Sequence, residues 1–361
     1  MEKHFQKITR ILVFFFLIIQ LVACEVEQGT NIKEETSPNL FTESNTESAP
    51  NDNLKIGFSM DTLEEERWLK DKELFTKELE ALGVEVDIMI ADEDAALQIA
   101  QVETMISNGV DLLVVVPYYT ETAAAIVEKA HSAGVKVVSY DRIITNANVD
   151  LYISFDNEMV GEIQAKSITN LVPKGNYVYI GGSVTDNNAI LLKKGVFNVL
   201  QPFIDSGDIK VVYDQWTEDW TPDNAYKNML EALEKNNNQI DAVIAGNDGT
   251  AGGAIKALEE KGLAGIIPVA GQDADLAAIQ RIVQGTQTMT AYKPIRELAK
   301  RAAELSVELA KGETIEVDRK INNGKIEVPS VLLSPVEVNI NNIEDTIIAD
   351  EFHSSEEVYG N

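Results

Sequence analysis

Short apolar runs rich in β-branched residues recur along the chain from Leu54 onward, each beginning about 15 to 30 residues after the previous one. Polar or glycine-containing segments separate most of these runs, which is typical of strands buried in a sheet. The pattern predicts strands over residues 55–60, 84–91, 111–117, 135–141, 151–155, 177–181, 209–213, 241–245, 267–271 and 288–292.

Helical patterns fill most of the gaps between the runs. Between the second and third runs, apolar residues recur at helical spacing, and Asn108-Gly109 is typical of a helix end. The last long helical pattern has an apolar face formed by Ile295, Leu298, Ala299, Ala302, Leu305 and Leu309. This alternation predicts an α/β fold, with parallel sheets covered by helices on both faces. Two successive doubly wound sheets suit the number of strands, which exceeds that of the alternative, an eight-stranded barrel.

The beginning of the chain follows a different pattern. Basic residues precede an apolar run over residues 11–23, which is shorter than the roughly 20 residues of a membrane-spanning helix. This predicts a cleaved signal peptide over residues 1–23. The next residue, Cys24, is the one cysteine of the chain and resembles the lipid-accepting cysteine of a bacterial lipobox. Residues 24–53 are therefore interpreted as a lipidated cysteine followed by a flexible, acidic tether.

Composition and charge narrow the class of protein. The 361 residues are 45% hydrophobic and 25% charged, which is typical of a globular protein and excludes a disordered or fibrous chain. Lys and Arg total 30 against 59 Asp and Glu, so the formal charge of -29 disfavours any nucleic-acid partner. A single cysteine excludes an internal disulfide and a cysteine-rich metal site.

Polar and aromatic side chains follow the ends of many predicted strands. In open α/β sheets, ligands bind beyond the carboxyl ends of the strands. The residues at these positions are Arg67, Trp68, Asp141, Arg142, Asp186, Asn187, Asn188, Trp220, Asn247, Asp273 and Lys293. Each has an ordinary structural role open to it, such as a helix N-cap or a core tryptophan. Together they offer donors and acceptors for vicinal hydroxyls and indole rings for a sugar face, and so predict a site for a neutral polyol.

A set of short motifs runs from Lys55 to Phe352. The motifs are Glu66-Arg67-Trp68, Ser139-Tyr140-Asp141-Arg142, Tyr152 to Glu158, Gly181-Gly182-Ser183 with Asp186-Asn187-Asn188-Ala189, Asp214-Gln215-Trp216 with Trp220, Asn247 to Gly253, Gly271 to Leu276 and Gly285 to Pro294. In these motifs the chain resembles the periplasmic sugar-binding proteins of type I fold. Within that family it is similar to the branch that binds D-xylose for bacterial ABC transporters.

The resemblance implies a fold of two doubly wound parallel-sheet lobes joined by a hinge of three crossings, which closes around a sugar. The N-terminal lobe is expected to comprise residues 54–156 and 295–332. The C-terminal lobe is expected to comprise residues 157–294 and 333–361.

The family also implies roles for the residues at the strand ends. Hydrogen bonds to the pentose hydroxyls and ring oxygen are expected from Arg67, Asp141, Arg142, Asn188, Asn247, Asp273 and Lys293. Trp68 and Trp220 are expected to pack on the faces of the sugar. Asp186 and Asn187 either bind the sugar or shape the loop that carries them.

The implied function is extracytoplasmic binding of D-xylose, without catalysis, and delivery of the sugar to the permease of an ABC transporter. Cys24 and its tether imply a lipid anchor on the cell membrane. That anchor leaves open a second interpretation, in which the chain senses xylose for a membrane histidine kinase. Neither a cofactor, a metal nor a nucleic acid is expected.

A glycosidase is the enzymatic alternative, because Asp141 and Asp273 could act as acid and base. Both carboxylates are more simply acceptors for sugar hydroxyls. His131 is interpreted as a solvated residue at a helix end, and His353 as part of a solvated acidic run over residues 344–357. The chain has no phosphate-binding glycine motif, and no basic helix-turn-helix of the kind that a sugar-responsive repressor needs.

Overall fold

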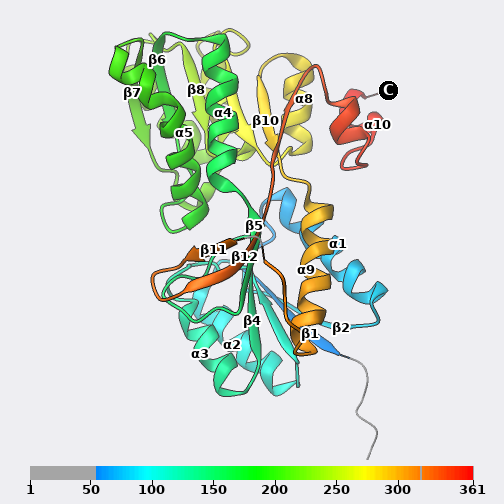
Figure 1. Ribbon diagram of the computed structural model, residues 1–361. Coiled ribbons are helices and arrows are strands. Elements are labelled where there is room, and N and C mark those ends of the chain that lie inside the picture. The colour runs from blue at the N-terminus through cyan, green and yellow to red at the C-terminus, as the bar shows by residue number, and fades with distance from the viewer. Residues whose placement is uncertain (1–53, 318, 361) are drawn as a thin grey trace, which may run out of the picture. The chain divides into compact units, whose positions relative to one another are not determined.

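The computed structural model describes residues 54–317 and 319–360, which form two lobes, each built on one sheet (Figure 1). The predicted signal peptide, Cys24 and the tether up to residue 53 lie outside the described residues and remain predictions. Of the helices in the described part of the chain, none is both long and apolar enough to cross a bilayer.

The first lobe is built on a seven-stranded sheet with the order β11-β12-β5-β4-β3-β1-β2. Its strands are β1 (Lys55–Met60), β2 (Glu85–Ile90), β3 (Leu112–Val115), β4 (Lys136–Tyr140), β5 (Leu151–Phe155), β11 (Arg319–Asn322) and β12 (Glu327–Leu333). Neighbouring strands are parallel except β11 and β12, which form an antiparallel pair at one edge.

The second lobe is built on a six-stranded sheet with the order β13-β10-β9-β8-β6-β7. Its strands are β6 (Gly175–Ile180), β7 (Ile209–Gln215), β8 (Ala242–Ala245), β9 (Val269–Gln272), β10 (Met289–Tyr292) and β13 (Val336–Asn339). All pairs are parallel except that of β13 with β10. The first five strands of each lobe follow the order 2-1-3-4-5 of a doubly wound sheet, which confirms the predicted fold class.

Helices cover both faces of each sheet (Figure 1). They are α1 (Glu66–Ala81), α2 (Ala95–Ser107), α3 (Ala124–Ser132), α4 (Asn157–Leu171), α5 (Asn187–Ser206), α6 (Pro222–Lys235), α7 (Asp248–Glu259), α8 (Leu276–Gln284), α9 (Ile295–Ala310) and α10 (Ser355–Tyr359). On the first sheet, α1 and α9 pack on one face, and α2 and α3 pack on the other. On the second sheet, α4 and α5 lie opposite α6 and α7.

This two-sided burial explains why the strands read as continuous apolar runs. In β3, Leu112 and Val114 belong to the core under α1 and α9, whereas Leu113 and Val115 belong to the core under α2 and α3. Successive side chains of a strand point to opposite faces, so a strand covered on both faces needs apolar residues at every position.

Three described strands, β11, β12 and β13, were not predicted. β11 is polar and lies at a sheet edge, and β12 contains Pro329, which has no N–H to donate. These strands form because the chain returns to each sheet after the last long helix. Neither the hydrophobic pattern nor the β-propensity of these residues indicates that return. Leu333, expected to open the second part of the C-terminal lobe, instead ends β12 opposite Phe155.

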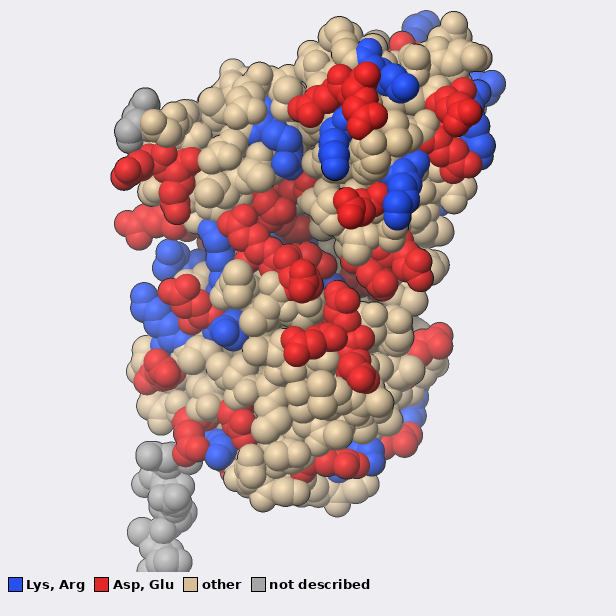
Figure 2. Space-filling view, turned by 180° about the vertical axis from the view of Figure 1, so that it is seen from behind, with Lys and Arg blue, Asp and Glu red and all other residues tan. Residues whose placement is uncertain are grey.

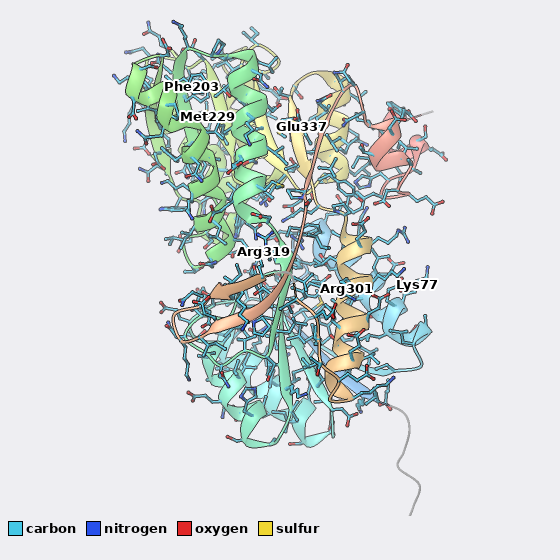
Figure 3. All side chains as sticks on the ribbon, in the orientation of Figure 1. Lys77, Phe203, Met229, Arg301, Arg319 and Glu337 are labelled. Atoms are coloured by element: carbon cyan, nitrogen blue, oxygen red, sulfur yellow. The ribbon has the colours of Figure 1, made fainter. Side chains whose placement is uncertain are left out.

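The chain passes between the two sheets three times, after β5, after β10 and after β12. At the first crossing, Asp156 caps α4 by accepting a hydrogen bond from the Met159 N–H at 3.1 Å. The same carboxylate lies 3.1 Å from Nη1 of Arg319 in β11. Figure 3 shows Arg319 beside the crossing segments, so this ion pair attaches the first crossing to the edge of the first sheet.

The C-terminal residues 340–360 are folded, and the expectation of a solvated acidic run is wrong. A π-helical turn (Glu344–Ile348) and α10 place Ile343, Ile347 and Val358 in a small core with α8 (Figure 1). His353 is also buried. The apolar residues are spaced among the acidic ones, so they face α8 while most of the carboxylates remain exposed.

Candidate functional site

A polar pocket of about 280 Å³ lies where the carboxyl ends of the strands of the two sheets meet. Its lining residues come from both lobes and are Glu65, Arg67, Trp68, Asp141, Arg142, Asp186, Asn188, Trp220, Asn247, Gln272, Asp273 and Lys293. In doubly wound sheets this is the edge at which ligands bind. Ten of the eleven predicted contact residues therefore lie around one pocket.

Asn187 is the predicted residue that does not line this pocket. It borders a separate groove of about 1,090 Å³, together with Thr145, Asn146 and Ile190. Its neighbour Asn188 faces the pocket and donates through Nδ2 to Oδ1 of Asp141 at 3.0 Å. Adjacent residues on a helix point in directions about 100° apart, so only one of the two asparagines can face the pocket.

Asp186 shapes the start of α5 and also lines the pocket. As the N-cap of α5 it accepts a hydrogen bond from the Asn188 N–H at 2.8 Å, which shapes the start of that helix. Its carboxylate also lines the pocket and lies 2.9 Å from Nε of Arg142. This ion pair connects the two lobes, because Arg142 follows β4 in the first sheet.

Arg67 organises one side of the pocket. The guanidinium is 4% exposed and lies 3.2 Å from Asp71, 2.8 Å from Asp141 and 3.6 Å from Asp273. Burial alone would raise the pKa of Asp141, but Arg67 and Lys293 outweigh burial and lower that pKa. Asp141 is therefore held as a carboxylate, which can accept but not donate hydrogen bonds.

Arg142 organises the other side of the pocket. Its Nη1 binds Asp61 and its Nη2 lies 3.9 Å from Glu65, in addition to the bond with Asp186. Burial raises the pKa of Asp61 to about 6, against the opposing effect of Arg142. The two arginines thus hold an excess of acidic groups in rigid positions.

Several buried polar atoms of the pocket have no hydrogen-bond partner among the residues that the structure describes. They are Oδ1 of Asn188, Nε1 of Trp220, Oε1 of Gln272 and Oδ1 of Asp273. Oδ1 of Asp273 nevertheless forms an ion pair with Nζ of Lys293 at 2.7 Å. Buried polar groups are nearly always paired, so the two amide oxygens and the indole N–H that have no partner in this pocket indicate a polar ligand.

The two tryptophans of the pocket are held differently. Nε1 of Trp68 donates to Glu65 at 2.5 Å, and the guanidinium of Arg67 lies 4.2 Å from the Trp68 ring centroid. The ring of Trp220 packs directly on the backbone of Gly182, where an added Cβ would lie 2.1 Å from the indole. Glycine at this position is therefore required for the Trp220 ring to reach the pocket.

Three residues that line the pocket have a left-handed backbone, with φ of 60° at Asp141, 57° at Trp220 and 94° at Asp273. Such values are unfavourable for residues other than glycine and persist where the surrounding structure enforces them. Both carboxylates sit in the turn that follows a strand, and the turn aims each side chain into the pocket.

The sequence pattern did not identify four residues of this site. Glu65 and Gln272 line the pocket, and Asp61 and Asp71 bind the two arginines. Asp61 and Gln272 lie at or directly after the ends of β1 and β9, so the strand-end rule could have found them. Asp71 carries no such signal, because an acidic residue on a helix usually faces solvent.

Acidic side chains also border the neighbouring space. An adjoining pocket of about 290 Å³ shares Arg142 and Trp220 with the site and is lined by Asp61, Glu93 and Asp219. Figure 2 shows acidic side chains concentrated across the middle of the face seen there. A field of this sign disfavours anionic ligands such as sugar phosphates and favours neutral ones.

We expect the stability of the ligand-free protein to depend on pH through Asp71. Burial raises its pKa from 3.8 to about 6, so the folded protein binds this proton more tightly than the unfolded chain does. The resulting stabilisation is complete below pH 3.8 and is lost as the pH rises through about 6, a change of about 3 kcal/mol.

Asp71→Asn, which is neutral at every pH, should abolish this dependence. Urea unfolding of both proteins should show the wild type losing most of this, about 2 kcal/mol, relative to the variant between about pH 4 and pH 7. A difference between the two proteins that stays constant with pH would contradict the assignment.

Two doubly wound lobes with one polar pocket between their strand ends define a two-lobed, periplasmic-type solute-binding protein. The family model described as periplasmic binding protein domain matches residues 56–314, and the chain belongs to this family. This confirms the resemblance that the sequence motifs predicted.

Individual relatives are consistent with this family. The chain is 52% identical to the D-xylose-binding periplasmic protein of Escherichia coli (strain K12) over 305 residues, which are 84% of this chain and 92% of the relative. It is 51% identical to the protein of the same description from Haemophilus influenzae over 312 residues, 86% and 94% of the two chains. A carbohydrate transporter solute binding protein from Chloroflexus aurantiacus, in complex with D-glucose, matches with a TM-score of 0.80 and 30% identity, covering 84% and 98%.

Proposed function

We propose that this chain binds D-xylose between its two lobes outside the cytoplasm and delivers the sugar to the permease of an ABC transporter. The observation that carries the proposal is the set of polar atoms without a partner in one pocket, contributed by Asn188, Trp220 and Gln272 beside the ion-paired carboxylate of Asp273. A neutral polyol supplies hydroxyls that both donate and accept, as this set requires. The choice of sugar rests on the relatives that are 52% and 51% identical and are described as binding D-xylose.

The mechanism is closure of the two lobes around the sugar. Residues of both lobes line the pocket, so a ligand touches all of them only when the lobes are together. Even without a ligand, Arg142 and Asp186 join the lobes, as do Asn188 and Asp141. The sugar shifts the population toward the closed form by the difference between its affinities for the closed and open forms.

The surroundings of Asp141 and Asp273 suit binding better than bond cleavage by this pair. A glycosidase needs one carboxylic acid that keeps its proton near neutral pH, together with a second carboxylate. Arg67 and Lys293 lower the pKa of Asp141, so this group is a poor proton donor. Asp273 is paired with Lys293 at 2.7 Å. We therefore assign both carboxylates to the recognition of hydroxyl groups.

Attachment to the membrane is part of the proposal. The apolar run over residues 11–23 followed by Cys24 supports a lipid on this cysteine. The 29 residues from 25 to 53 are long enough to let the lobes reach a permease in the same membrane.

Calorimetric titration of the full chain with D-xylose, D-glucose, D-ribose and L-arabinose tests this function. We expect D-xylose to bind at least about tenfold more tightly than each of the others. Tighter binding of another sugar would overturn the assignment of D-xylose and keep the class. Binding of none of the four would overturn both.

A further inference from the structure

The folded C-terminal segment, residues 340–360, contacts the first lobe next to the pocket. It follows β13 of the second sheet and packs on α8 through Ile343, Ile347 and Val358, so it moves with the second lobe. Nζ of Lys70, in the first lobe, donates to the backbone oxygen of Phe352 at 2.6 Å. The same ammonium lies 3.9 Å from the centroid of the Phe352 ring.

His353 extends this contact toward the pocket. The side chain is buried, with 4% of its surface exposed, and its Nε2 lies 2.7 Å from the backbone oxygen of Ala274. Its Nδ1 lies 3.2 Å from Nζ of Lys70. A carbonyl oxygen only accepts hydrogen bonds, so Nε2 carries the proton and Nδ1 accepts from the lysine. Burial, with a contribution from Lys70, lowers the pKa of His353, which agrees with this neutral form.

Ala274 links the histidine to the ligand pocket, because it follows Asp273 in the chain. Both residues have positive φ, of 94° and 57°, and such a turn is held only by its surroundings. Thr290 accepts a hydrogen bond from the Ala274 N–H at 3.1 Å, and Asp248 accepts one from the Asp275 N–H at 3.1 Å. His353 adds the bond to the Ala274 carbonyl and so restrains the turn from the opposite side.

Helix α1 carries both parts of this arrangement. Its first turn places Arg67 and Trp68 in the pocket, and Lys70 on the C-terminal segment. Glu66, in the same turn, accepts a hydrogen bond from the Leu276 N–H at 3.0 Å, at the start of α8. The contacts of Lys70 and Glu66 join α1 to the second lobe, and both are lost if the lobes separate.

We propose that residues 340–360 form a clasp that holds the closed lobes together, and that His353 is a positioning residue for sugar binding. Lys70 of the first lobe, His353 of the clasp and the Ala274 carbonyl of the second lobe form one hydrogen-bonded chain. That chain is complete only in the closed form and ends beside Asp273. The clasp therefore slows the release of the sugar and holds the Asp273 carboxylate in place. This inference rests on the proposed sugar binding for its effect on affinity, but not for the contacts themselves.

Four variants of the full chain test the clasp by calorimetry and by stopped-flow tryptophan fluorescence with D-xylose. Lys70→Met removes both donated hydrogen bonds and keeps an aliphatic side chain against Phe352. His353→Gln keeps a donor for Ala274 and loses the Nδ1 acceptor, whereas His353→Phe loses both. Lys77→Met is the matched control, because Lys77 is an exposed lysine farther along α1 (Figure 3).

We expect Lys70→Met and His353→Gln to raise Kd about tenfold, through faster dissociation at an unchanged association rate. His353→Phe should raise Kd about a hundredfold, and Lys77→Met should leave it unchanged within about twofold. The circular dichroism spectrum of ligand-free Lys70→Met should match that of the control, which shows that both variants are folded. Equal dissociation rates for Lys70→Met and Lys77→Met would overturn the proposal, as would equal affinities for the two His353 variants.

Hydrogen exchange of the ligand-free protein provides a test that needs no sugar. In Lys70→Met, backbone amides of residues 350–354 and 274–276 should exchange faster than in the wild type and in Lys77→Met. If the wild type binds no pentose but this difference is found, the proposed function fails and the clasp stands. If the exchange rates are equal in all three proteins, the clasp fails whatever the titrations show.

Discussion

Asp273→Asn is expected to weaken D-xylose binding about a hundredfold while leaving the fold intact. Asp273 is nearly buried, and its Oδ1 forms an ion pair with Lys293 at 2.7 Å but has no assigned hydrogen bond among the described residues, so it can still accept from a sugar hydroxyl. A carboxylate that accepts from sugar hydroxyls forms charge-assisted bonds, each about 1.5–3 kcal/mol in strength. The amide keeps the volume of the side chain but presents an N–H group where an acceptor is needed.

Asparagine is preferred over alanine at this position because of the backbone. The φ of 94° at Asp273 is tolerated better by asparagine than by alanine, so the change isolates the loss of charge. Asp92→Asn is the matched control, since Asp92 is exposed, lies outside the pocket and has a φ of 46°. Calorimetric Kd values and urea midpoints of both variants provide the comparison. An Asp273→Asn protein that binds within about threefold of the control would show that the carboxylate does not face the sugar.

Arg67→Met is expected to lower the free energy of unfolding by about 3–5 kcal/mol and to abolish measurable xylose binding. The guanidinium lies 3.6 Å or less from Asp71, Asp141 and Asp273, and all three carboxylates are nearly buried. Without Arg67, their charges repel one another in a region from which water is largely excluded.

The charge and the geometry of Arg67 can be separated by further variants. Arg67→Lys keeps a cation but cannot form the same fork of hydrogen bonds, so its stability should lie between those of the wild type and Arg67→Met. Adding Asp71→Asn to Arg67→Met should recover part of the lost stability, because one buried carboxylate is removed.

Arg301→Met is the control for this series. Arg301 lies on the exposed side of α9, and its pair with Glu304 at 3.4 Å should contribute about 0–1 kcal/mol (Figure 3). The free energies of unfolding are measured by urea titration followed by circular dichroism. If Arg67→Met proves no more destabilising than Arg301→Met, the central role of Arg67 is refuted.

The predicted strands show where the hydrophobic pattern alone is enough to locate a strand. All ten predicted runs overlap strands β1 to β10, and most of these, such as β3 and β8, are buried on both faces of a parallel sheet and so carry mainly apolar residues. β11, β12 and β13 escaped prediction because they follow the last long helix, outside the regular alternation of strands and helices. Their polar residues and Pro329 follow from those positions.

The pocket residues also include some that the sequence could predict and some that it could not. The rule that ligands bind beyond strand ends placed Asp141, Asp273 and Lys293 at the site, because each directly follows a strand or lies within a residue of its end. It could not separate Asn187 from Asn188, which differ only in the side of α5 to which they point. It also missed Asp71, whose burial depends on Arg67 one helical turn earlier and on the Tyr140 hydroxyl, which donates to it at 2.6 Å.

The linear pattern was enough for the succession of strands and helices, the two doubly wound sheets and the strand ends at which ligands bind. Each of these follows from how a single element is buried. The buried faces of a strand or helix require apolar residues at a regular spacing, which can be seen in the sequence of that element. Pairs such as Arg142 with Asp186, and Lys70 with His353, join residues 44 and 283 positions apart, and no local period records them. They exist only because folding brings two lobes together, and the burial that follows then decides which polar atoms are paired and which remain available to a ligand.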